Sequence, residues 1–146
     1  VVSSMKKISR GIVINRKLQN KVVGSYISAL KIKTPNDRQR IRFLSGGNQQ
    51  KVILARWMAT DPKLIILDEP TRGIDVGAKQ EVEKLVLDFA AQGISVIYIS
   101  SELSELVRNC DRIIVLRDGR NVGELSGDEI KEQSIMAMIA AESEEG

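Results

Sequence analysis

The sequence has 146 residues, of which 42% are apolar and 28% charged, so it is long enough to fold around one hydrophobic core. Its 22 basic and 19 acidic residues are mixed along the chain and leave a net charge of +3, which argues against nucleic acid as a partner. The single cysteine, Cys110, excludes an internal disulfide, and the lack of histidine removes the commonest general base and metal ligand. Chemistry must therefore use carboxylates, hydroxyls, amides and the backbone.

The first third of the chain has helical periodicity. Between Asn15 and Leu30, apolar residues recur at steps of three and four, which predicts an amphipathic helix. A charged loop over 31–43 then leads to Leu-Ser-Gly-Gly-Asn-Gln-Gln-Lys at 44–51. A second helix is expected from Asn48 to Thr60, with one face made by Val52, Ile53, Arg56 and Trp57.

The rest of the chain alternates apolar strands with helices. Residues 64–67 are apolar throughout and too few for a helix, which predicts a central strand buried on both faces. Such alternation predicts a parallel α/β layer after Lys63. The other expected elements are a helix over 76–92, a buried strand over 95–99, a short helix over 102–109, a third strand over 113–116, a hairpin turn at Asp118-Gly119 leading into 120–124, a helix over 127–141 and a frayed acidic end at 142–146.

A serine and two glycines stand where the second helix starts. The first turn of a helix offers unpaired backbone N–H groups and the positive end of the helix dipole, which together attract anions. Ser45, Gly46 and Gly47 are therefore candidates for holding a phosphate, and the glycines let a ligand approach the backbone closely. The alternative is an ordinary loop.

Two carboxylates follow the strand at 64–67. At the carboxyl edge of a parallel sheet, where ligands bind, Asp68 is a candidate for holding Mg²⁺ through water. Glu69 is then a candidate general base that polarises the attacking water. The alternative is a strand end that happens to be charged.

Together these motifs carry a family resemblance. Leu-Ser-Gly-Gly, a helix and then Leu-Ile-Ile-Leu-Asp-Glu-Pro-Thr resemble the signature, Walker B and D-loop succession of ATP-binding cassette (ABC) proteins. More narrowly, Leu-Ser-Gly-Gly-Asn-Gln-Gln-Lys-Val with Asp-Glu-Pro-Thr-Arg-Gly-Ile-Asp-Val-Gly-Ala-Lys is similar to the second cassette of ATPase subunits of bacterial monosaccharide importers of the ribose, galactose and xylose type. The resemblance runs from Leu44 to Ile139. It implies an α/β fold, in which part of a P-loop NTPase (RecA-like) core with a parallel sheet joins a mainly helical subdomain.

The resemblance also implies roles for the signature residues. In the family, the signature of one cassette closes over the γ-phosphate held by the P-loop of a partner cassette. Ser45, Gly46 and Gly47 would accordingly bind ATP in trans, and Asn48 stands where the general pattern has glutamine, as is typical of the sugar-importer subgroup.

The resemblance to ATP-binding cassette proteins also implies roles for three acidic residues. Asp68 would take the Walker B magnesium role and Glu69 that of catalytic base. Asp75 would be the D-loop aspartate that communicates across the cassette dimer. Its alternative role is the N-cap of the following helix.

The chain departs from the family pattern in two ways. At the position of the family's switch histidine stands Ser101, which is a poor proton carrier. None of the eleven glycines is followed by lysine, so no P-loop occurs, and the family's Q-loop and adenine-stacking aromatic residue would lie upstream of Val1. We therefore expect a carboxyl-terminal part of a longer nucleotide-binding domain that is inactive by itself.

These expectations define a domain plan and a function. Residues 1–60 would form the helical signature subdomain, 61–125 the carboxyl-terminal part of the RecA-like core and 126–146 a terminal helix with an acidic tail. The full-length subunit would use ATP and Mg²⁺ to energise carbohydrate import at the cytoplasmic face of the membrane. Its partners would be a second cassette, transmembrane permease subunits and, indirectly, a periplasmic sugar-binding protein. The piece alone is expected to self-associate through uncovered sheet edge and apolar helix faces.

Two alternatives stay open. One is a regulatory or structural cassette with a degenerate, non-hydrolysing site, which Ser101 favours and the intact Asp68 and Glu69 oppose. The other is a soluble cassette ATPase of DNA repair or translation. The near-neutral charge and the lack of clustered basic and aromatic residues argue against that second alternative.

Overall fold

A computed structural model describes residues 9, 10 and 13–141 of the chain. The acidic end expected at 142–146 lies outside the described residues. The chain divides into two compact units, residues 1–97 and 98–146.

The first unit begins with a short hairpin and a helix. Strands β1 (Ser9–Arg10) and β2 (Val13–Ile14) pair antiparallel. Helix α2 (Arg16–Ala29) follows, and its first turn is capped by Asn15, whose side-chain oxygen accepts a hydrogen bond from the Leu18 N–H at 3.1 Å. The helix predicted from the apolar spacing is confirmed.

Helix α3 (Gly46–Met58) follows a loop and the 3₁₀ turn η2 (Ile41–Phe43). It starts two residues before the predicted Asn48, so both signature glycines belong to its first turn. The helix face predicted to carry Val52, Ile53, Arg56 and Trp57 is largely exposed, with Ile53 and Trp57 at 40% and 54%. The buried residues are Gly47, Lys51, Leu54 and Ala55.

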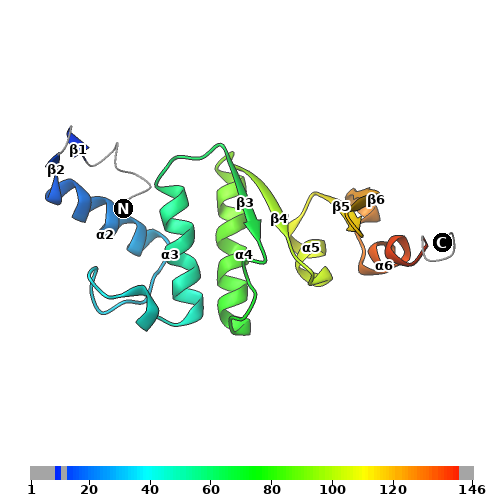
Figure 1. The fold of residues 1–146 in the computed structure, drawn as a ribbon, viewed down its shortest axis with the longest axis horizontal. Helices are drawn as coiled ribbons and strands as arrows, with labels where there is room; N and C mark the ends of the chain where they lie inside the picture. Colours follow the sequence, from blue (N-terminus) through cyan, green and yellow to red (C-terminus); the bar gives the residue numbers. More distant parts are fainter. Residues whose placement is uncertain (1–8, 11–12, 142–146) are drawn as a thin grey trace. The chain divides into compact units, whose positions relative to one another are not determined.

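Helix α4 (Val76–Ala91) lies beside α3 and connects two parallel strands, β3 (Leu64–Asp68) and β4 (Ser95–Ile99) (Figure 1). Successive side chains of a strand point to opposite faces, and Ile65 and Leu67 are each 6% exposed. Leu64 and Ile66, on the other face, are 49% and 61% exposed.

The predictions that β3 is buried on both faces and that β4 is a buried strand are therefore wrong. β3 alternates between exposed and buried residues, and β4 alternates between exposed and half-buried ones. Among the described residues, only one face of the two strands is covered. An apolar run on its own does not distinguish a strand buried on both faces from one with an uncovered side.

The second unit contains α5 (Leu103–Asn109) and a hairpin of β5 (Arg112–Arg117) and β6 (Arg120–Ser126). Its turn is Asp118-Gly119, where φ is +50° and +76°, so the predicted hairpin is confirmed. β5 pairs antiparallel with β6 in a sheet of its own, so the prediction of a third strand in the parallel layer is wrong.

The helix predicted over 127–141 is divided in two. A 3₁₀ turn η3 (Gly127–Glu129) is followed by Ile130 in an extended conformation, and α6 (Glu132–Ala141) starts after it. α6 packs closely on the hairpin, since a Cβ built on Gly123 would lie 2.7 Å from the Met138 sulfur. The core of this unit consists of Ile113, Val115, Leu125 and Ile135.

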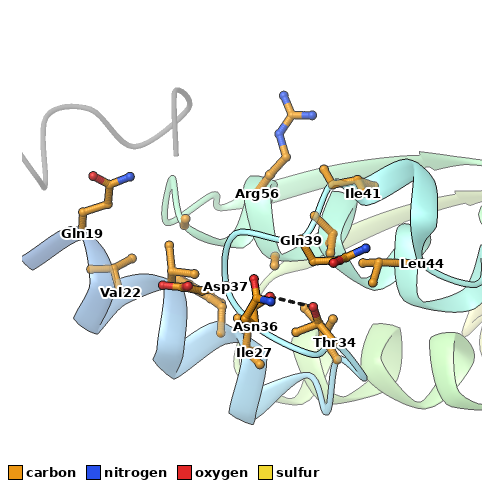
Figure 2. A pocket seen from close by; sticks show the side chains of 16 residues that line it. Gln19, Val22, Ile27, Thr34, Asn36, Asp37, Gln39, Ile41, Leu44 and Arg56 are labelled. Carbon is orange, nitrogen blue, oxygen red and sulfur yellow. Dashed lines mark hydrogen bonds between the residues drawn. The ribbon is translucent and has the colours of Figure 1, made fainter. Parts of the chain in front are cut away.

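A cavity of about 280 Å³ lies on the side of α3 that faces α2 (Figure 2). Residues of α2, of the loop that follows it and of α3 line this cavity, including Val22, Ile27 and Val52. The loop is folded on itself by a hydrogen bond of 2.7 Å from the Thr34 hydroxyl to the Asn36 carbonyl.

Candidate functional site

The residue before α3 has an unusual hydrogen bond. Ser45 is the N-cap of the helix, in an extended conformation, yet its hydroxyl does not cap a backbone N–H group within the described chain. Instead, Ser45 Oγ accepts a hydrogen bond of 2.8 Å from Asn48 Nδ2. Because the hydroxyl is held by a side chain, the first N–H groups of α3 keep the anion-attracting character of an uncapped helix start.

Two amide side chains of the first turn hold the segment in front of it. Asn48 Oδ1 accepts a hydrogen bond of 2.8 Å from the Lys33 N–H, which belongs to the loop after α2. Gln49 Nε2 donates a hydrogen bond of 2.8 Å to the Leu44 carbonyl. The path of the chain into Ser45 is therefore fixed by side chains of the helix that it starts.

The two glycines allow α3 to approach the first turn of α4 and the segment in front of it. A Cβ built on Gly47 would lie 2.4 Å from the Ala78 Cβ, which is closer than real Cβ atoms come. One built on Gly46 would lie 3.1 Å from the Ile74 Cγ2. Gly47 is buried and Gly46 is exposed. Thus Gly47 is needed for packing, whereas Gly46 remains accessible at the helix start.

An ion pair joins the same two helices farther along. Lys51 Nζ contacts Glu81 Oε2 at 2.5 Å and lies 3.4 Å from the Lys31 carbonyl oxygen. The Lys51 side chain is 4% exposed and that of Glu81 is 53% exposed. The hydrogen bond and charge of Lys51 hold the pKa of the Glu81 carboxyl below its usual value.

The predicted carboxylates lie where β3 ends. Asp68 is the last residue of β3 and is exposed, and Glu69 is half-buried with φ of +47°, in the left-handed region. The Glu69 carbonyl accepts a hydrogen bond from the Arg72 N–H at 3.1 Å, which closes a tight turn. The end of β3 and the starts of α3 and α4 lie at the same end of this unit (Figure 1).

Asp75 is the N-cap of α4. Its Oδ1 accepts a hydrogen bond of 2.9 Å from the Ala78 N–H, which is the alternative role that the sequence left open. Gly46 contacts Ile74 and Gly47 contacts Ala78. The structure therefore brings the signature residues together with the segment that carries Asp75.

Ser101 belongs to the second unit, where it is exposed and follows β4. A buried carboxylate lies next to this segment: Glu105 is 1% exposed and accepts hydrogen bonds from the Tyr98 and Ser100 hydroxyls at 3.0 and 3.1 Å. Sequence reasoning missed this cluster. A glutamate in a helix is usually solvated, so the sequence offered little reason to expect a buried one. The hydroxyl residues Tyr98 and Ser100 were the sequence feature that could have indicated hydrogen-bond donors for it.

The lone cysteine, Cys110, is half-buried. Cys110 packs against the core of the second unit. Burial, followed by the charge of Asp111, raises the pKa of its thiol. The thiol is therefore protonated at neutral pH and is a poor nucleophile.

Among the described residues, no group of three or more Cys, Asp and Glu residues is arranged to hold a metal ion. Mg²⁺ in nucleotide sites is held by one or two carboxylates together with phosphates and water, so the exposed Asp68 at a strand end fits its chemistry. No helix between residues 13 and 141 has the length and apolar character needed to cross a bilayer.

Comparison with known proteins identifies the family to which this chain belongs. The sequence profile of the family described as ABC transporter matches residues 3–72. The fold is that of an ATP-binding cassette: the ADP conformation of a cassette of an ABC transporter superimposes with a TM-score of 0.67 and 27% identity over 84% of this chain and 45% of that one. The chain belongs to the ABC transporter family, as a segment of its ATP-binding cassette.

The relatives of this chain include two arabinose import ATP-binding proteins. The Arabinose import ATP-binding protein AraG 1 of Burkholderia lata is 51% identical over 129 residues, or 88% of this chain and 26% of that protein. AraG of Burkholderia pseudomallei is 52% identical over 127 residues, or 86% of this chain and 25% of that protein. The chain thus spans about a quarter of the length of the curated relatives that it matches.

Proposed function

We propose that this chain is part of the ATP-hydrolysing subunit that energises import of a monosaccharide through an ABC transporter. The observation that carries the proposal is the identity of about half of its residues to arabinose import ATP-binding proteins over most of its length. Arabinose or a related sugar is accordingly the proposed cargo. The proposed partners are a second cassette, the permease subunits and, through them, a sugar-binding protein, and the proposed location is the cytoplasmic face of the membrane.

The signature residues would bind ATP held by the partner cassette. The exposed start of α3, with the Ser45 hydroxyl and the N–H groups of Gly46 and Gly47, offers donors and a favourable dipole to a γ-phosphate. Interactions that strengthen as charge develops on the transferred group lower the barrier to hydrolysis. Residues 1–60 would form the helical subdomain that carries this surface, 61–125 part of the core, and 126–146 the terminal helix and tail.

The carboxylates at the end of β3 would serve the nucleotide of this cassette. Asp68 would hold Mg²⁺, which when bound neutralises phosphate charge. Glu69 would accept hydrogen bonding from the attacking water and polarise it. The left-handed backbone at Glu69 supports this role, because strained residues of this kind are concentrated at functional sites.

Replacing Glu69 with glutamine in the full-length transporter tests the proposal. We expect ATP hydrolysis to fall by roughly 10²-fold or more, with ATP retained in the closed cassette dimer, because a general base typically contributes 10²–10⁴-fold. The measurement is phosphate release together with the number of ATP molecules trapped per dimer. Unchanged turnover and trapping would instead favour a second candidate, a regulatory cassette whose own site does not hydrolyse ATP.

One observation favours that second candidate. Ser101 occupies the position of the switch histidine in the resemblance, and a serine hydroxyl carries a proton poorly at neutral pH. Ser101→His in the full-length subunit separates the two. We expect a rise in turnover if Glu69 is a working base limited by proton transfer, and no change if the site is degenerate.

A further inference from the structure

We propose that Asn48 is a positioning residue that sets the direction of the Ser45 hydroxyl proton. It holds Ser45 Oγ as a hydrogen-bond acceptor, so that the single O–H proton is directed to an anionic oxygen. This inference rests on the proposed binding of a phosphate at Ser45. It adds a residue with its own chemical role to that site.

The orientation of the Asn48 amide follows from its two partners. The oxygen and nitrogen of an asparagine amide are assigned from their hydrogen-bond partners. One end of this amide lies 2.8 Å from the Lys33 backbone nitrogen, which is a donor only. That end must therefore be Oδ1. The other end, 2.8 Å from Ser45 Oγ, must then be the NH₂ group.

The remaining step is a proton count at Ser45. A serine hydroxyl has one proton and two acceptor lone pairs. Asn48 Nδ2 supplies the proton of the bond between them, so the Ser45 proton is not used there. The hydroxyl of Ser45 does not cap a backbone group of α3 in the described structure. A hydroxyl whose lone pair is occupied by a donor also becomes a better donor itself, because neighbouring hydrogen bonds polarise one another.

If Asn48 had a purely structural role, its two hydrogen bonds would not be equally important. In that role Asn48 ties the loop after α2 to α3, and only the bond to the Lys33 N–H matters. Asn48→Asp separates the roles, because a carboxylate oxygen still accepts from the Lys33 N–H. Its second oxygen is an acceptor only, so the Ser45 hydroxyl must turn and donate to it.

The experiment is a double-mutant cycle in the full-length ATPase subunit assembled with its permease. The variants are S45A, N48D and the pair, and the readouts are kcat, KM for ATP and Tm. Q50E is the matched control, because it adds the same charge near the start of α3 at a half-buried side chain outside the proposed site. If the inference holds, S45A and N48D each lower kcat by about 10²-fold, as loss of one donor to developing charge does, and the double variant falls no further.

The outcomes separate this inference from the proposed function. If S45A leaves kcat and KM unchanged, phosphate binding at Ser45 is wrong and both proposals fall. If S45A is impaired but N48D keeps normal kcat, only the role of Asn48 is overturned. The same holds if the losses of kcat in S45A and N48D multiply in the double variant, or if Q50E loses as much kcat as N48D. If N48D lowers Tm strongly, N48Q and N48E repeat the comparison with equal chain lengths. In that comparison N48Q must have a kcat at least about tenfold higher than that of N48E, and equal kcat values overturn the inference.

Discussion

The two long faces of α3 differ in how closely they are packed. Toward α4, Gly47 packs on Ala78 and Lys51 pairs with Glu81, so the helices leave no room for a Cβ at residue 47. Toward α2, a cavity of about 280 Å³ separates apolar side chains. Signature residues adjoin both faces, since Gly47 packs toward α4 and Leu44 lines the cavity toward α2. Substitutions on the two faces should therefore have opposite effects on stability.

The largest effect is expected on the closely packed face. Gly47→Ala places a methyl group 2.4 Å from the Ala78 Cβ and should lower the free energy of unfolding by about 3 kcal/mol, because well-packed helices tolerate added volume poorly. Urea unfolding measures the change.

Ala78→Gly provides the control for this contact. In the G47A/A78G pair the new methyl group meets the Ala78 position at its Cα, 3.6 Å away, which is an ordinary contact. The pair should recover most of the loss. Failure of A78G to rescue G47A would show that Gly47 is needed for another reason.

The Lys51–Glu81 ion pair should respond unequally to loss of its two partners. Glu81→Gln leaves a buried ammonium group without its carboxylate and should cost about 1–2 kcal/mol. Lys51→Met removes the buried charge and leaves a glutamate that water can solvate, so it should cost less than about 1 kcal/mol. A larger loss for K51M than for E81Q would contradict this assignment.

The same ion pair gives a dependence on pH. The pKa of Glu81 is lowered in the folded chain from an ordinary value of 4.5, so its contribution is fully present above that pH. The contribution is lost as pH falls through the lowered folded pKa. The difference in stability between the wild-type chain and E81Q should therefore be constant near pH 7 and shrink below about pH 4.5.

A glycine on the exposed surface of α2 should show the opposite sign. Gly24 is an exposed residue inside α2, and a Cβ built on it meets nothing within 4 Å among the described residues. Gly24→Ala should raise the free energy of unfolding by about 0.5–1 kcal/mol, because alanine loses less backbone entropy in a helix. A destabilised G24A would indicate that α2 is packed on that side as well.

The smallest effect is expected from filling the cavity. Val52→Ile adds one methylene to a half-buried side chain that lines it, and should stabilise by about 0.5 kcal/mol. Val76→Ile is the control, because Val76 is 73% exposed and the same methylene there enters water. Equal changes in Tm for the two variants would show that the cavity does not accept the added group.

The sequence predicted those parts of the fold that local chemistry decides. Helical spacing predicted α2, and Asp118-Gly119 predicted the hairpin, because both depend on neighbouring residues alone. The covering of β3 was not predictable in this way, since burial of Leu64 and Ile66 depends on which other layers lie against the strand.

The sequence predicted which residues belong to the candidate site, but not the contacts that hold them in place. The motifs pointed to Ser45, Asp68 and Glu69 because each has a chemical type that suits phosphate, metal or water. The contacts of Asn48 with Lys33 and of Lys51 with Glu81 join residues fifteen and thirty positions apart, so no local pattern revealed them. Those contacts depend on the packing of α3 against α4 and against the loop after α2, which only the folded chain shows.

The contact between Gly47 and Ala78 has a mechanical consequence. Two helices that touch at their backbones near their starts and are joined by an ion pair farther along resist sliding past each other. The starts of α3 and α4, with Ser45 before one and Asp75 before the other, should therefore move together. In the proposed function, closure over a nucleotide would then be coupled to a rearrangement of the turn before α4.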